Sequence, residues 1–132
     1  MTRLLLDTDT LVWVIDAPAR LPAEVMEMIA NGDNEVLFSA ASIWEIAIKA
    51  SRQKPDFLID PAEIAADAIA TGFVEVPVAS AAAARVANLA PLHRDPFDRL
   101  LVAQAMQLPA NLITSDRFLQ GYSELVKPFD PR

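Results

Sequence analysis

Short apolar segments alternate with helical segments along the chain, and this alternation limits the possible folds more than any other feature. The segments RLLLD (3–7), EVLFS (35–39) and NLITS (111–115) are almost continuously apolar. Such runs are typical of strands buried on both faces, and strands that alternate with helices form parallel sheets covered by helices. We therefore predict an α/β fold: a three-layer α/β/α sandwich around a central, mainly parallel sheet.

The remaining segments carry helical patterns or short strand patterns. Proline opens the segments 22–32 and 61–72, and glycine closes them, as expected for helices. Further strands are expected at 73–78 and at 124–129, the latter at a sheet edge because Pro128 cannot donate to a ladder. The predicted helices cover residues 10–16, 22–32, 40–52, 61–72, 80–90 and 96–108.

Length and composition limit the number of domains, the cellular compartment and the kinds of partner. The 132 residues suit one domain, spanning 1–132. The chain has no cysteine, which excludes disulfides and thiolate sites and favours a reducing cytoplasm. We expect no signal peptide or membrane span at MTRLLLDTD, where an acid follows three leucines. The net charge of −7 argues against binding nucleic acid by bulk electrostatics, but not against a nucleic-acid substrate reached through bound cations.

Several kinds of active site are excluded by missing residues. None of the three glycines lies in a phosphate-binding loop, and neither GxGxxG nor GxxxxGK[ST] occurs. His93 is the only histidine and no GxSxG elbow exists, which argues against a hydrolase triad and excludes histidine-rich metal sites. Carboxylates remain, and clustered carboxylates favour Mg²⁺ or Mn²⁺.

Four acids are candidates, and each also has a structural interpretation. Asp7 ends the first strand and Asp116 closely follows the NLIT strand, so both lie where ligands bind in parallel sheets. Asp7 is equally suited to cap the next helix, and Asp116 to a turn. Glu45 and Lys49 fit an ordinary i,i+4 pair on one helix.

The fourth acid lies in HRDPFDRLLVAQA (93–105). Asp95 fits the N-cap of the helix, and Asp98 fits the third helical position of a capping box. The segment DPAEIAADAIA (60–70) has the same arrangement, with Asp60 as the cap. Helix capping therefore explains both acids of the later segment without any function.

Taken together and in this order, four motifs resemble those of the PIN-domain ribonucleases, and most closely the VapC-type toxins of bacterial toxin–antitoxin pairs. LLLDTDTLVW is similar to the opening motif and carries Asp7, and SAASIWEIAIK resembles the second and carries Glu45. HRDPFDRLLVAQA and LITSD are similar to the third and fourth motifs and carry Asp98 and Asp116. The resemblance covers nearly the whole chain and implies a single PIN-like domain.

The resemblance also implies a chemistry. The four acids would hold one or two Mg²⁺ or Mn²⁺ ions that activate water for hydrolysis of RNA phosphodiester bonds. Thr114 would position a carboxylate or the water, and Lys49 and Arg99 would hold flanking phosphates. Asp9 stands where related toxins often carry a residue such as histidine, and adds negative charge near the site.

A cognate antitoxin that occludes the site, a homodimer and an RNA substrate are the partners that the resemblance implies. Two alternatives have other folds. Asp7-Thr8-Asp9 also matches the DxD opening of haloacid-dehalogenase-like phosphatases, and Asp60 with Lys127-Pro128 is similar to a receiver-like signalling module. A PIN fold that only binds partners is a further alternative, against which the four acids argue.

Overall fold

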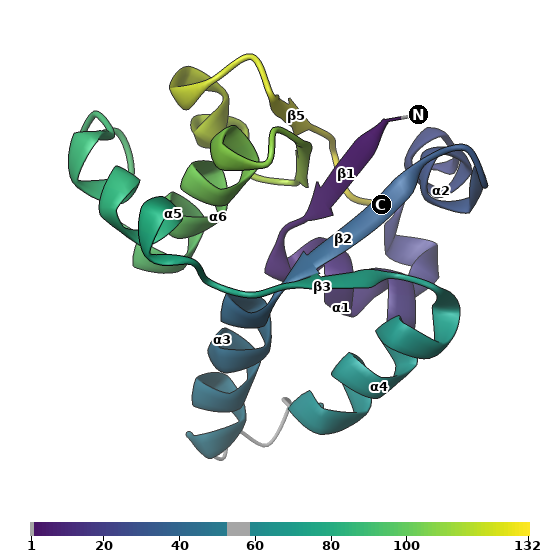
Figure 1. The fold of residues 1–132 in the computed structure, drawn as a ribbon. Coiled ribbons are helices and arrows are strands. Elements are labelled where there is room, and N and C mark those ends of the chain that lie inside the picture. The colour runs from purple at the N-terminus through teal and green to yellow at the C-terminus, as the bar shows by residue number, and fades with distance from the viewer. Residues whose placement is uncertain (1, 53–58) are drawn as a thin grey trace.

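The computed structural model describes residues 2–52 and 59–132, and its centre is a five-stranded sheet in the order β3-β2-β1-β4-β5 (Figure 1). Every strand pair among these residues is parallel. The strands are β1 (Arg3–Leu6), β2 (Glu35–Ser39), β3 (Val74–Val76), β4 (Asn111–Thr114) and β5 (Val126–Pro128). The predicted parallel sheet is confirmed, and β5 lies at an edge as expected.

Helices cover both faces of the sheet. The helices α1 (Thr8–Asp16), α2 (Ala23–Ala30), α3 (Ala40–Ser51) and α4 (Pro61–Thr71) pack on one face, and α5 (Ser80–Arg85) and α6 (Pro96–Gln107) cover the other. Short 3-10 segments are η1 (Pro18–Arg20), η2 (Val86–Asn88) and η3 (Arg117–Tyr122). The three-layer α/β/α sandwich is therefore confirmed. Among the described residues, no helix is long and apolar enough to cross a membrane.

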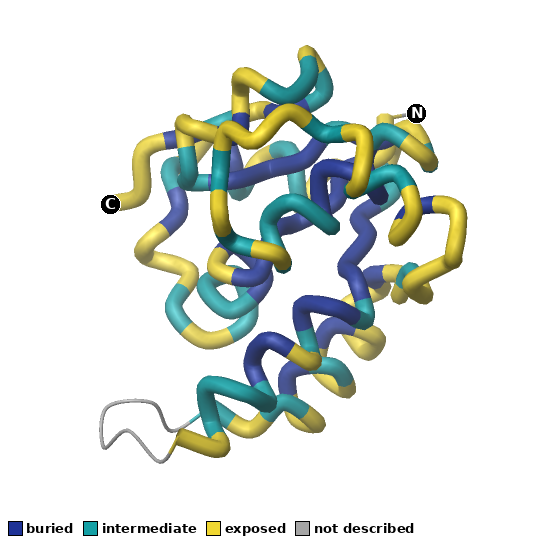
Figure 2. The backbone as a smooth tube through the Cα atoms, turned by 90° about the vertical axis from the view of Figure 1, so that its left-hand side faces the viewer, coloured by how far each residue is buried: buried dark blue, intermediate teal, exposed yellow. Residues whose placement is uncertain are grey.

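The strands supply the core because they are apolar on both faces. Leu4 and Leu6 of β1 face the α1–α4 layer, whereas Leu5 faces α6. All three side chains are buried, and the tube in Figure 2 shows the buried strands between more exposed helices. Burial on both faces explains why these strands lack the polar alternation of an exposed sheet.

Some predicted elements are shorter in the structure, among them the strand expected over 124–129, which is limited to Val126–Pro128. The helix expected over 80–90 ends at Arg85, because the Arg99 guanidinium donates to the carbonyls of Val86, Leu89 and Ala90 and holds that segment in another path. The strand expected over 73–78 is limited to Val74–Val76. A contact distant in sequence therefore overrides the helical pattern of the alanine-rich segment.

The order of the strands reverses near the centre of the sheet. The chain runs outward from β1 to β3 on one side and then continues at β4 on the other, so the order reverses between β1 and β4. Ligands of open parallel sheets bind at such a reversal, beyond the carboxyl ends of the strands. The receiver-like alternative requires the order 2-1-3-4-5, which this sheet does not have.

Candidate active site

Asp7 lies directly beyond β1, at the reversal of strand order. Its side chain is 5% exposed; Oδ1 accepts a hydrogen bond from the Thr10 amide (2.8 Å) and Oδ2 from the Thr114 hydroxyl (2.6 Å). Burial raises the pKa of Asp7 to about 6, although these hydrogen bonds oppose the shift. Asp7 is therefore the N-cap of α1 and also a carboxylate fixed at the reversal of strand order.

Thr114 joins the first acid to the fourth. Its hydroxyl donates to Asp7 and accepts from the backbone amide of Asp116 (3.0 Å). Asp116 Oδ1 accepts from the Phe118 amide (2.9 Å) and caps η3. The end of β4 thus brings Asp116 beside Asp7 through one threonine.

Glu45 reaches the same region from α3. The residue is 9% exposed, and Oε1 accepts a hydrogen bond from the Thr8 hydroxyl (2.6 Å), which also lies 3.0 Å from Ser42 Oγ. Lys49 Nζ lies 3.3 Å from Glu45 Oε2, so the i,i+4 pair also exists. Sequence analysis did not select Thr8 or Ser42, although Thr8 follows the first acid directly.

Asp98 lies in the first turn of α6, whose N-cap is Asp95. Burial, followed by the negative charges of neighbouring acids, raises the pKa of Asp98 to about 8. The contributing neighbours are Asp95, Asp7, Glu45 and Asp116. The structure therefore brings the other three acids selected from the sequence close enough to Asp98 to repel its charge.

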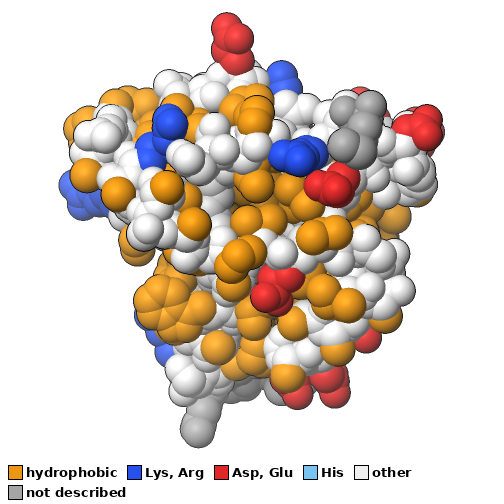
Figure 3. Space-filling view, in the orientation of Figure 1, with side chains coloured by type: hydrophobic (Ala, Val, Ile, Leu, Met, Phe, Trp, Pro, Cys, Tyr) orange, Lys and Arg blue, Asp and Glu red, His pale blue; other side chains and the backbone are white. Residues whose placement is uncertain are grey.

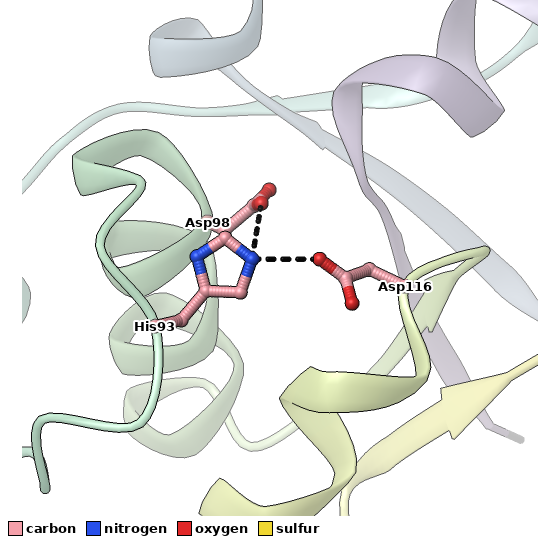
Figure 4. Close-up of side chains that lie close together, drawn as sticks. All are labelled: His93, Asp98 and Asp116. Carbon is pink, nitrogen blue, oxygen red and sulfur yellow. Dashed lines mark hydrogen bonds and ion pairs between the residues drawn. The ribbon is translucent and has the colours of Figure 1, made fainter.

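His93 lies between two of these acids, as Figure 4 shows. Its Nε2 is 2.8 Å from Asp116 Oδ2 and 3.8 Å from Asp98 Oδ2. One ligand atom from each of the three residues lies within 4.8 Å of the others. The sequence pattern did not indicate a site role for His93; its place two residues before the helix cap was the available signal.

The supporting residues expected from the sequence have different surroundings in the structure. Asp9 is exposed, and its charge contributes to the raised pKa of Asp7. Lys49 is paired with Glu45. Arg99 corrects the expectation: its guanidinium donates to the carbonyls of Val86, Leu89, Ala90 and His93 and to the Tyr122 hydroxyl, so it holds a loop rather than facing a phosphate.

The donor set fits a hard divalent cation. In the described ranges, no lysine or arginine forms an ion pair with Asp7, Asp98 or Asp116, and Lys49 is the one such partner of Glu45. Four carboxylates with so little compensating charge are oxygen ligands of the kind that Mg²⁺ and Mn²⁺ prefer. The arrangement can therefore hold such an ion.

The model of the PIN domain family matches residues 4–124 of the chain. The match contradicts the phosphatase alternative, which requires another family. Comparison with curated proteins finds no match. Among solved structures, the chain is similar to the crystal structure of VapBC2 from Rickettsia felis bound to a DNA fragment from their promoter. The identity is 15%, the alignment covers 99% of this chain and 100% of that chain, and the TM-score is 0.68, so the likeness concerns the fold. With the family match over nearly all of its length, the chain belongs to the PIN domain family.

Proposed function

We propose that this protein is a Mg²⁺- or Mn²⁺-dependent endoribonuclease of the VapC type, acting in the cytoplasm as a toxin that a cognate antitoxin neutralises. The observation that carries the proposal is the crowding of Asp98 by other acids. Its pKa of about 8 reflects burial together with neighbouring negative charges. A divalent cation would relieve this repulsion, and it would make an acidic protein compatible with a polyanionic substrate.

In this proposal Asp7, Glu45, Asp98 and Asp116 hold the ion. When bound, the ion would supply an activated water and stabilise charge on the phosphodiester. Thr114 orients Asp7 through a 2.6 Å hydrogen bond, and Thr8 orients Glu45 in the same way. The hydrogen-bond donors to Asp7 are thus neutral and leave its charge for a cation, whereas Glu45 also has the Lys49 ammonium 3.3 Å from Oε2.

A groove beside the acids supports a nucleic-acid substrate. Glu45 lies in its wall, and Lys49, Arg52 and Arg94 supply positive charge. Phe97 also lines this groove and packs edge-on against Trp44, with ring centroids 5.2 Å apart. The Trp44 side chain is 62% exposed. Basic groups contact phosphates and exposed aromatic rings stack on unpaired bases, so this surface suits single-stranded RNA.

Exposed apolar side chains near the β3 edge support a protein partner. Ile69, Val74 and Val78 are all exposed, and hydrophobic side chains are widespread on the face in Figure 3. Exposed apolar patches are typical of interaction surfaces. Because the similar Rickettsia felis structure is a VapBC2 complex, we propose the antitoxin as this partner, with a homodimer of the chain as a further assembly.

Cleavage of RNA by the purified protein tests the catalytic proposal. We expect single-stranded RNA to be cut with Mg²⁺ or Mn²⁺, not with EDTA, and not by Asp7→Asn with either metal. Asp67→Asn is the matched control, because it removes one negative charge from an exposed position on α4. Cleavage that persists in EDTA, or phosphate-ester hydrolysis without RNA cleavage, would contradict the proposal.

A further inference from the structure

We propose that His93 is a positioning residue: its Nε2–H holds the Asp116 carboxylate at the site, and the imidazole is not a metal ligand. The inference rests on the metal site proposed above. It concerns the side chain that lies closest to Asp116, with Nε2 2.8 Å from Oδ2. That distance alone would suit either a hydrogen bond or two ligands of one ion.

The other ring nitrogen decides between these roles. His93 Nδ1 accepts a hydrogen bond from the Asp95 backbone amide at 3.0 Å. An amide N–H only donates, so Nδ1 carries a lone pair and the proton of the neutral ring lies on Nε2. A protonated Nε2 donates to the carboxylate and has no lone pair for a cation.

The backbone of His93 is held on both sides, which fixes the direction of the ring. Its amide donates to the Tyr122 hydroxyl at 2.9 Å, and its carbonyl accepts from the Arg99 guanidinium. Arg99 also donates to the Tyr122 hydroxyl (3.1 Å), so the two supports are joined. The position of the imidazole is therefore built by residues outside the acid cluster.

His93 and one backbone amide together orient both oxygens of Asp116. Oδ1 accepts from the Phe118 amide and Oδ2 accepts from His93 Nε2. Each carboxylate oxygen has two lone pairs, so both keep the capacity to bind a cation. Hydrogen-bonding partners of this kind typically change metal affinity about 10- to 100-fold.

Metal affinity tests the role without measuring RNA cleavage. Electron paramagnetic resonance can measure the Mn²⁺ affinity of the wild type, His93→Ala and His93→Gln. We expect His93→Ala to weaken binding about tenfold or more, and His93→Gln, whose amide can donate to Asp116, to restore most of it. Gln107→Ala, at the other end of α6, is the control with wild-type affinity.

The single histidine makes a direct readout possible. Only one pair of imidazole nitrogens exists in the chain, so ¹⁵N NMR of the ring at alkaline pH reports its tautomer without ambiguity. We expect the proton on Nε2 in the metal-free protein and also with saturating Mg²⁺. A shift of the proton to Nδ1 on addition of Mg²⁺ would identify a ligand and overturn the proposal.

The outcomes separate this inference from the proposed ribonuclease. Wild-type affinity in His93→Ala, equal losses in the Ala and Gln variants, or absence of Mn²⁺ binding to the wild type would each overturn the positioning role. A wild type that binds Mn²⁺ with the expected order of variants but cuts no RNA refutes the ribonuclease and leaves the positioning role intact.

Discussion

The starts of α4 and α6 share one sequence pattern and have different surroundings. Asp60 and Asp95 are both N-caps, each followed by proline, and each accepts backbone hydrogen bonds from its own first turn. Three residues after each cap stands an acid. Glu63 is exposed, whereas Asp98 is largely buried among other carboxylates and has a pKa of about 8.

The difference shows that a local sequence pattern determines where the helix starts but not whether its acidic residues belong to a site. Asp95 accepts from the amides of Phe97 and Asp98, and Asp60 caps α4 by accepting from the amide of Ala62. Only the start of α6 lies beside the ends of β1 and β4. The second acid of the pattern is therefore structural in α4 and a candidate metal ligand in α6.

The largest expected difference between the two starts is in RNA cleavage. Asp98→Asn should lower the metal-dependent rate at least about 100-fold. It removes a proposed metal ligand, and losing a ligand should lower the rate more than losing a residue that only orients a ligand. Glu63→Gln, the equivalent change at the start of α4, should leave the rate unchanged. Initial rates on one labelled RNA, with both variants at matched Mg²⁺, measure the contrast.

Thermal unfolding accompanies this comparison. Both variants should fold, so their circular dichroism spectra should match that of the wild type. If Asp98→Asn cleaves RNA at the wild-type rate and only melts at a lower temperature, the two helix starts are equivalent and Asp98 is a capping residue.

The second expected difference is in the pH dependence of stability without metal. The pKa of Asp98 rises from 3.8 to about 8 on folding, chiefly by burial, so the unfolded chain loses this proton first as pH rises. Stability associated with this group is complete below 3.8 and is lost as pH approaches about 8. Asp7, with a pKa of about 6, acts in the same direction.

Asp98→Asn should remove this loss. We expect the free energy of unfolding of the variant, relative to wild type, to increase as pH rises through that window. Urea unfolding in EDTA at several pH values measures it, with Glu63→Gln as the reference. Parallel curves for wild type and Asp98→Asn would show that Asp98 does not have a raised pKa.

The smallest effect concerns the feature that the two starts share. Asp60→Ala and Asp95→Ala should each lower the free energy of unfolding by about 1 kcal/mol, because each removes an N-cap acceptor. Urea unfolding at fixed pH measures both. A loss at Asp60 without one at Asp95 would mean that relief of repulsion around Asp98 offsets the lost cap.

Much of the fold follows from local pattern. Continuous apolar runs predicted the parallel strands, and Pro128 predicted the edge position of β5, because burial on both faces and a missing donor act within a few residues. The end of α5 could not be predicted in this way. It depends on Arg99, which lies on another helix and donates to the carbonyls of Val86, Leu89 and Ala90.

The candidate site also has a part that the sequence predicted and a part that depends on contacts between distant residues. Resemblance to a family selected the four acids, and their proximity follows from strand order. The resemblance also selected Thr114, which donates to Asp7, but not Thr8, which meets Glu45 across 37 positions, or His93, which meets Asp116 across 23. Such contacts depend on the packing of separate elements, which single-residue patterns do not encode.

The hydrogen bond between Thr114 and Asp7 has a consequence for synthesis of the protein. The two residues are 107 positions apart, and the Asp7 amide also donates to the carbonyl of Ile113. A nascent chain that ends just before residue 111 contains Asp7, Glu45 and Asp98 but has no β4 to place beside β1. Nearly the whole sequence must therefore be synthesised before the acids can assemble. A fragment that terminates before β4 carries most of the acidic residues but cannot form the site.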